Sequence, residues 1–229
     1  MNNDDQILLN KIKYMNKKLM ETYKKVDTKI TFDNTLFILD WDDTLFPTTW
    51  ASKNRINLLD NSSREQYVVH FQDLDRALTK FLKTISKYGK IVIVTHAMPN
   101  WIKISSIVIP QTNNLIKNID VVSARGLFAE TTSNRMDWKK MAFQLVIKKE
   151  FKKKPVMNVI SIGDAEYEHN ALVALTQTNF DKIKYLKSFK LLTDPHYDLI
   201  IDQLSVLDTS IHHLWNLHTQ ICKTFKVEN

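Results

Sequence analysis

Cysteine, glycine and long apolar runs are all scarce in this chain of 229 residues. The single cysteine, Cys222, cannot form an intramolecular disulfide, so we expect an ordinary packing residue in a reducing compartment. The glycines, Gly89, Gly126 and Gly163, are too few for the Gly-rich phosphate loops of P-loop or dinucleotide-binding proteins. Each glycine is therefore expected where the backbone requires it.

No apolar run reaches the roughly 18 residues that a bilayer span needs. The N-terminal sequence MNNDDQILLNKIKYM also lacks the apolar centre of a signal peptide. A hydrophobic content of 44% and a charged content of 25% are ordinary for a globular protein. We therefore expect an intracellular, cytoplasmic protein without a transmembrane segment.

The chain is basic, with 32 lysines and arginines against 25 acidic residues and a formal charge of +7. Such a charge favours polyanionic partners, among them phosphorylated ligands. The lysines are spread widely, however, which is typical of a solvated basic surface. Because no nucleic-acid reading motif accompanies the charge, nucleic acid is not expected as a partner.

Short apolar segments alternate with helical patterns along the chain. Strands of this wholly apolar kind are buried on both faces of a parallel sheet. The alternation predicts an α/β fold in which helices cover a parallel sheet of about five strands. The predicted strands are Thr35–Leu39, Ile91–Val94, Ile119–Val122, Val156–Ile162 and Ile183–Phe189.

Amphipathic helices are predicted at both ends of the chain. Residues 1–30 form the first, and residues 31–229 form a single domain that closes with a helix over 196–229. Another helix is predicted over 70–88, and residues 45–69 before it form a flap or small insert. The apolar stripe of the last helix comprises Ile200, Leu204, Leu207, Ile211, Leu214, Ile221 and Phe225.

Three carboxylates follow the first strand in the sequence LFILDWDDT. If the strand continued, Asp40 and Asp42 would face the same way, because side chains alternate along a strand. Carboxylates so close repel one another unless a cation lies between them, and Mg²⁺ prefers such oxygen ligands. The alternative is a simple turn made by Asp42, Asp43 and Thr44.

Three further segments place polar groups at strand or helix ends. The second strand ends in IVIVTHA with Thr95, and ISIGDAEYEH delivers Asp164, with Glu168 four residues later. A helix beginning with WKKMAF carries Lys139 and Lys140 near its start. In parallel sheets, ligands bind beyond the carboxyl ends of the strands, so these groups are expected to form one site.

The segments LFILDWDDT, IVIVTHA, WKKMAF and VISIGDAEYE resemble the four motifs of haloacid dehalogenase (HAD) superfamily phosphohydrolases, from about Leu36 to Phe189. The resemblance implies a Rossmann-like three-layer fold and Mg²⁺-dependent hydrolysis of a phosphomonoester through an aspartyl phosphate. The short insert at 45–69 indicates a capless or minimally capped member. An open site favours a macromolecular substrate such as a phosphoprotein, and small phosphomonoesters remain an alternative.

The resemblance also implies roles for individual residues. Asp40 would be the nucleophile, and Asp42 would protonate the leaving oxygen and then activate water. Asp40, the backbone carbonyl of Asp42, and Asp164 would hold the metal. Thr95 and a lysine would offset the phosphoryl charge. We favour Lys139 for that lysine because it directly follows Trp138, as in related sequences.

Other residues are expected around this set. Lys140 and Thr44 would contact the residues that bind the metal or substrate, without binding either one themselves. Glu168 would do the same, although the family usually has aspartate at its position. His96 follows the motif threonine, where it would either touch substrate or make a structural hydrogen bond. In the flap, Trp50, Lys53 and Arg55 are candidates for substrate contact, unless Trp50 is a buried anchor.

Two other interpretations compete with that of a phosphatase. Terminal amphipathic helices that present a groove or a coiled-coil seam to a protein partner would make the chain a scaffold or complex subunit with little catalysis. Receiver domains also combine acidic residues, a threonine and a lysine. Their phosphate-accepting aspartate lies on a middle strand and their lysine comes last, whereas Asp164 here follows the lysine.

Overall fold

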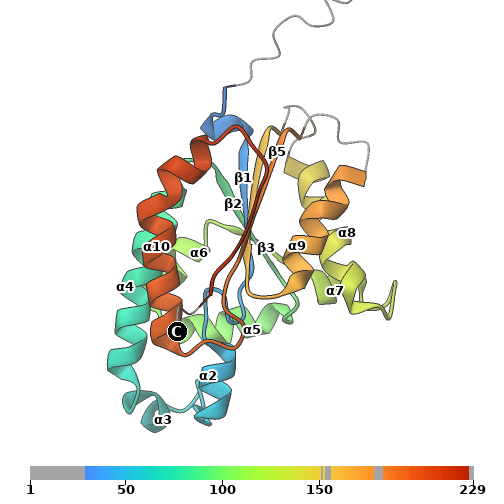
Figure 1. Cartoon of the computed structure of the whole chain (residues 1–229). Helices are drawn as coiled ribbons and strands as arrows, with labels where there is room; N and C mark the ends of the chain where they lie inside the picture. The colour runs from blue at the N-terminus through green and yellow to red at the C-terminus, as the bar shows by residue number, and fades with distance from the viewer. Residues whose placement is uncertain (1–28, 151, 153–155, 178–182, 227–229) are drawn as a thin grey trace, which may run out of the picture.

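The computed structural model describes residues 29–150, 152, 156–177 and 183–226. A six-stranded sheet forms the middle of three layers, with every neighbouring pair of strands parallel and the order β3-β2-β1-β4-β5-β6 (Figure 1). This confirms the predicted Rossmann-like α/β fold, with one strand more than the five predicted. The strands are β1 Thr35–Leu39, β2 Lys90–Thr95, β3 Asp120–Ser123, β4 Asn158–Gly163, β5 Tyr185–Lys190 and β6 Ile221–Thr224.

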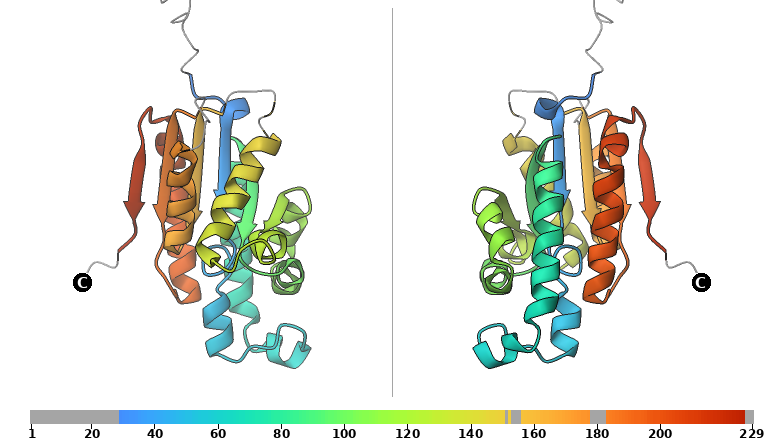
Figure 2. Two further views of the ribbon diagram at one scale, coloured as in Figure 1. Left: turned by 90° about the vertical axis from the view of Figure 1, so that its right-hand side faces the viewer. Right: turned by 90° about the vertical axis from the view of Figure 1, so that its left-hand side faces the viewer.

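Helices cover both faces of the sheet (Figures 1 and 2). One face carries α4 (Val68–Ile85), α6 (Pro110–Ile116) and α10 (Tyr197–Asn216), and the other carries α7 (Ala124–Phe128), α8 (Arg135–Glu150) and α9 (Glu166–Ala174). The short helix α5 (Pro99–Ser105) follows β2 near the carboxyl ends of the strands.

The alternation of side chains along β1 divides the core into two parts. Phe37 and Leu39 pack with α4 and α10, whereas Leu36 and Ile38 pack with α8 on the other face. All four side chains are buried. Both faces of the strand are therefore covered, which explains why its sequence is apolar throughout.

The C-terminal part of the chain differs from the prediction. The helix predicted over 196–229 ends at Asn216, and the chain then returns to the sheet as β6 beside β5. The apolar stripe of α10 is buried against α4, and Ile221 begins the new strand. The predicted packing role of Cys222 is wrong, because Cys222 is exposed on β6.

The flap segment contains two short helices, α2 (Thr48–Lys53) and α3 (Asn61–Glu65). Trp50, 6% exposed, packs against the rings of Tyr67 and Tyr197, so it anchors the segment to α4 and α10. Lys53 forms an ion pair with Asp194 in the loop before α10.

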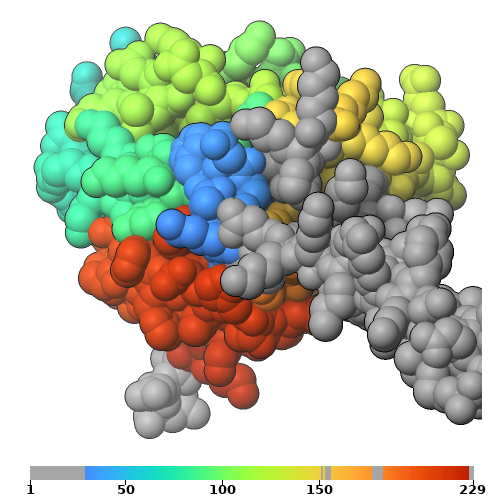
Figure 3. All heavy atoms as spheres, turned by 90° about the horizontal axis from the view of Figure 1, so that it is seen from above, coloured from blue at the N-terminus to red at the C-terminus, as the bar shows by residue number. Residues whose placement is uncertain are grey.

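Residues 1–28 of the predicted N-terminal helix lie outside the described residues. Figure 3 looks onto the amino-terminal edge of the sheet, where the start of β1 lies beside the C-terminal elements. There the indole nitrogen of Trp215 donates to Thr35 Oγ1 at 3.0 Å. Within the described part of the chain, no helix combines the length and the apolarity needed to cross a membrane.

Candidate active site

The site lies at the carboxyl ends of the two central strands, β1 and β4. The chain builds β2 and β3 on one side of β1, and β5 and β6 on the other side of β4. Parallel sheets form a ligand-binding crevice where the order reverses in this way. Asp40 follows β1, and its backbone nitrogen donates to the carbonyl of Ile162 in β4 at 2.9 Å. Asp164 follows β4, which puts the two aspartates on either side of the reversal.

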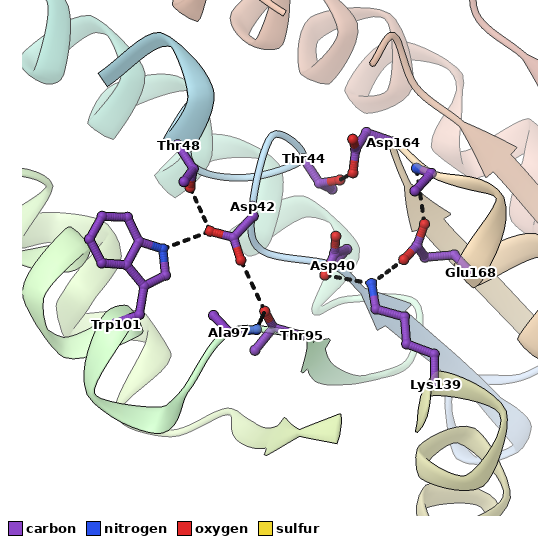
Figure 4. Close-up of polar contacts among 11 residues, drawn as sticks. Asp40, Asp42, Thr44, Thr48, Thr95, Ala97, Trp101, Lys139, Asp164 and Glu168 are labelled. Carbon is purple, nitrogen blue, oxygen red and sulfur yellow. Dashed lines mark hydrogen bonds and ion pairs between the residues drawn. The ribbon is translucent and has the colours of Figure 1, made fainter. Parts of the chain in front are cut away.

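Three carboxylates and one ammonium meet at this point (Figure 4). Asp40, Asp164 and Glu168 each offer a carboxylate oxygen, and these oxygens lie within 4.8 Å of one another. Lys139 is 1% exposed and reaches in from α8. Its Nζ lies 2.7 Å from Asp40 Oδ1 and also pairs with the carboxylate of Glu168. We call these four residues the acidic cluster.

Glu168 belongs to this cluster directly, although the sequence suggested a supporting position. The first turn of α9 directs its side chain back over the end of β4, where Oε2 accepts from the backbone nitrogen of Ala165 at 3.1 Å. A Cβ on Gly163 would lie 2.3 Å from Glu168 Cγ. Glycine is therefore required here by close approach, because none of the described glycines has a positive φ.

The charges in the cluster do not balance, because one ammonium faces three carboxylates. Burial raises the pKa of Asp40, and the carboxylates of Glu168 and Asp164 raise it further against the opposing effect of Lys139. Burial and then the charge of Glu168 raise the pKa of Asp164 to about 7. Burial lowers the pKa of Lys139, but its two carboxylate partners outweigh this and hold the pKa above its ordinary value. The ammonium therefore stays charged, whereas the carboxyl groups of Asp40 and Asp164 are protonated more readily than free carboxyl groups.

This donor set fits a hard divalent cation such as Mg²⁺. All three carboxylates offer oxygen, the ligand that Mg²⁺ prefers, and a divalent charge would offset the excess of negative charge. The missing Cβ at Gly163 also leaves room for the carboxylate of Glu168 at the strand end.

The side chain of Asp42 is directed away from the acidic cluster and accepts three hydrogen bonds (Figure 4). Oδ1 accepts from Thr48 Oγ1 at 2.5 Å and from Trp101 Nε1 at 2.6 Å. Oδ2 accepts from Thr95 Oγ1 at 3.2 Å. Sequence reasoning missed Thr48 and Trp101, since their approach depends on how α2 and α5 pack.

The loop that carries Asp42 is held by its own polar side chains. Asp43 has a φ of 53°, in the left-handed region, and its carboxylate accepts from the backbone nitrogen of Thr49 at 2.9 Å. Asp43 thus makes the turn that the sequence indicated. Thr44 is buried, and its hydroxyl donates to Asp164 Oδ1 at 3.4 Å. The hydroxyl of Thr95 also accepts from the backbone nitrogen of Ala97 at 2.9 Å.

Two predicted neighbours of the site have different surroundings. Lys140 points away from the acidic cluster and pairs with Asp137 one turn earlier on α8, at 3.1 Å. The ring of His96 packs against Trp138 and Tyr167, and within the described chain its buried Nε2 has no hydrogen-bond partner. Burial, together with the charges of Lys139 and Arg135, lowers the pKa of His96 to about 4, so the imidazole is neutral at neutral pH.

Comparison of the chain with protein-family models, with curated proteins and with solved structures found no match.

Proposed function

We propose that this protein is a Mg²⁺-dependent phosphatase of the HAD type, which hydrolyses a phosphomonoester through an aspartyl phosphate on Asp40. The observation that carries the proposal is the meeting of Asp40, Asp164, Glu168 and Lys139 where the strand order reverses. Asp42 and Thr95 lie beside them and are joined by a hydrogen bond.

Asp40 would act as the nucleophile. A carboxylate oxygen of Asp40 attacks phosphorus, the bond from phosphorus to the leaving oxygen breaks, and Asp42 gives its proton to that oxygen. Asp42 then takes a proton from a water molecule, whose oxygen attacks the phosphorus of the aspartyl phosphate. This second step releases inorganic phosphate and restores the Asp40 carboxylate.

The remaining groups reduce the repulsion between a phosphoryl group and the carboxylates. Lys139 supplies a fixed ammonium beside Asp40, and the buried hydroxyl of Thr95 supplies a hydrogen-bond donor. Asp40, Asp164 and the backbone carbonyl of Asp42 would hold the metal. When bound, Mg²⁺ neutralises charge that develops on the transferring phosphoryl oxygens.

A phosphoprotein is the proposed substrate class. The insert between β1 and α4 contains only the short helices α2 and α3, which is too little for a folded cap domain. A site without a cap does not enclose a small metabolite, so a macromolecular substrate could itself exclude water. Small phosphomonoesters are the second candidate.

The test is Mg²⁺-dependent hydrolysis of p-nitrophenyl phosphate by the purified chain. Asp40→Asn should abolish turnover, and Asp42→Asn should strongly reduce it. Beryllium fluoride, which mimics the aspartyl phosphate, should inhibit the wild type and should bind far more weakly to Asp40→Asn. If the wild type binds beryllium fluoride with Mg²⁺ but hydrolyses no phosphoester, the alternative of a complex subunit with an idle site replaces the phosphatase.

A further inference from the structure

We propose that Trp101 is a positioning residue that fixes the orientation of the Asp42 carboxyl group, with Oδ1 turned away from Asp40 and Oδ2 left on the side where the leaving oxygen would lie (Figure 4). This inference rests on the proposed function, in which Asp42 donates a proton to the leaving oxygen. Trp101 comes from α5, outside the four segments that carry the resemblance to phosphohydrolases.

The two oxygens of Asp42 have different partners. Oδ1 accepts from Trp101 Nε1 at 2.6 Å and from Thr48 Oγ1 at 2.5 Å, whereas Oδ2 accepts only from Thr95 Oγ1, at 3.2 Å. In Figure 4, Oδ1 faces Trp101 and α2, on the side away from Asp40. The carboxylate is therefore held in one orientation by α2, β2 and α5 together.

An indole N–H is a donor and never an acceptor, whereas a threonine hydroxyl can do either. The indole N–H therefore holds Oδ1 as an acceptor on the side away from Asp40, together with the hydroxyl of Thr48 (Figure 4). At Oδ2 the hydroxyl of Thr95 can donate to a carboxylate or accept from a protonated carboxyl group. Trp101 thus leaves Oδ2 as the oxygen from which a proton can pass to the leaving group.

The indole is itself fixed in place by the residues around it. Its ring packs edge-on against Phe46, with 6.1 Å between ring centroids. One turn along α5, Ser105 Oγ donates to the backbone carbonyl of Trp101 at 2.8 Å and accepts from Trp41 Nε1 at 2.9 Å. The adjacent residues Trp41 and Asp42 are therefore both hydrogen-bonded to α5, through Ser105 and Trp101. These contacts and the packing on Phe46 fix the direction of the indole N–H.

The proposed step moves one proton. The O–H bond at Asp42 Oδ2 breaks as the bond from phosphorus to the leaving oxygen breaks, and the proton passes to that oxygen. An alkyl oxygen is a poor leaving group and needs this proton, whereas a nitrophenolate leaves readily as an anion. Loss of the indole N–H should therefore slow alkyl phosphates more than p-nitrophenyl phosphate.

The experiment compares Trp101→Phe with the wild type in the presence of Mg²⁺, using phosphoserine as the alkyl substrate and p-nitrophenyl phosphate as the aryl substrate. Trp101→Phe keeps an aromatic ring at this position and removes the N–H donor. We expect kcat for phosphoserine to fall on the order of tenfold, the effect of one lost hydrogen bond to a charged group, with KM unchanged. The kcat for p-nitrophenyl phosphate should fall by less than about twofold.

Trp215→Phe is the matched control. Trp215 is half-buried like Trp101, and its indole nitrogen also donates one hydrogen bond, to Thr35 at the opposite edge of the sheet. This variant should leave the ratio of the two kcat values unchanged. Thr48→Val, which removes the other donor to Oδ1, should reproduce the selective loss, and it provides the test if Trp101→Phe does not fold.

An equal loss of kcat for both substrates in Trp101→Phe, or no loss for either, would overturn the role of Trp101 while leaving the phosphatase in place. A wild type that hydrolyses neither substrate would overturn the proposed function, and the inference with it.

Discussion

Lys139 and Lys140 are neighbours in the chain with opposite surroundings. Lys139 is 1% exposed and pairs with Asp40 at 2.7 Å, whereas Lys140 is partly exposed and pairs with Asp137 at 3.1 Å. Both lie near the start of α8, so the turn of the helix alone separates a cation within the acidic cluster from one at the surface. The two lysines form a natural pair for mutagenesis.

We expect Lys139→Met to lower the kcat for p-nitrophenyl phosphate by about a hundredfold or more, because it removes the cation that offsets the phosphoryl charge in the proposed mechanism. Lys140→Met should leave kcat within about twofold of wild type, since Lys140 and its partner Asp137 are both partly exposed and lie outside the acidic cluster. Steady-state kinetics of the two variants check this prediction. Equal losses in both would mean that Lys139 has no special part in the chemistry.

Gly163→Ala should disrupt the cluster without changing any charged residue. The new methyl group would displace the side chain of Glu168, whose Cγ lies 2.3 Å from the Cβ position, and would separate it from Lys139. We expect Mg²⁺ to raise the unfolding temperature of the wild type, and we expect Gly163→Ala to lose most of this stabilisation.

Gly89→Ala is the control, because a Cβ on this glycine would also clash with its neighbours but would do so far from the acidic cluster. Its Cβ would meet the backbone oxygen of Thr35 at 2.7 Å, at the amino-terminal edge of the sheet. This variant should unfold at a lower temperature than the wild type but keep its full response to Mg²⁺. If Gly163→Ala responds to Mg²⁺ as Gly89→Ala does, the position of Glu168 in the acidic cluster does not contribute to metal binding.

The response of Asp164 to pH supplies a third prediction. Its folded pKa of about 7 lies above the unfolded value, so the carboxyl is more easily protonated in the folded protein. In the metal-free protein, the protonated carboxyl of Asp164 stabilises the folded state at low pH, and this stabilisation is lost as the pH rises through 7. Asp164→Asn cannot ionise, so its stability advantage over the metal-free wild type should grow between pH 4 and pH 8, to on the order of 4 kcal/mol for a pKa raised by roughly three units.

Urea unfolding in the presence of EDTA measures this difference at each pH. Added Mg²⁺ should reverse the order at pH 8, because the cation replaces the proton in the wild type and lacks one ligand in Asp164→Asn. A difference that stays constant from pH 4 to pH 8 would show that Asp164 does not titrate in this range.

The sequence predicts the sheet well wherever strands are buried on both faces. The predicted bounds of β1, Thr35–Leu39, are the observed ones, because the four consecutive apolar residues 36–39 cannot lie on an exposed surface at low cost. The edge strand β6 was not predicted, since three of its four residues are exposed and carry no apolar pattern. Its first residue, Ile221, also continues the apolar spacing of α10, which extended the predicted helix too far.

The sequence likewise predicts those site residues that a strand positions, but not those that the packing of distant helices positions. Asp40 and Asp164 follow strands and Thr95 ends one, so the parallel sheet alone brings them to one edge. The partners of Asp42 are set by the packing angles of α2 and α5, which no local pattern encodes. The direct membership of Glu168 in the cluster likewise depends on the absence of a side chain at Gly163.

A buried lysine at the other end of the sheet gives a prediction that is independent of function. Lys187 on β5 is 0% exposed, and within the described residues it forms no ion pair with a carboxylate. Its Nζ donates at 2.8 Å to the carbonyl of Trp215, at the C-terminal end of α10, where the helix dipole favours a cation. Burial nevertheless lowers the pKa of Lys187 to about 8.

A folded pKa below the unfolded value of roughly 10.4 means that charging Lys187 costs stability at neutral pH, and that this cost disappears as the pH rises from 8 to 10. Lys187→Met should therefore be more stable than the wild type at pH 7, by on the order of 2 kcal/mol, and its advantage should shrink towards pH 10. The Trp215 carbonyl keeps a hydrogen bond from Asn158 Nδ2 at 3.2 Å in this variant.

Lys223→Met, which removes an exposed lysine from the adjacent strand, should show a difference from wild type that does not vary with pH. Urea unfolding at each pH distinguishes the two, and an advantage of Lys187→Met that is absent at pH 7 would mean that the α10 carbonyl fully offsets the burial of the charge.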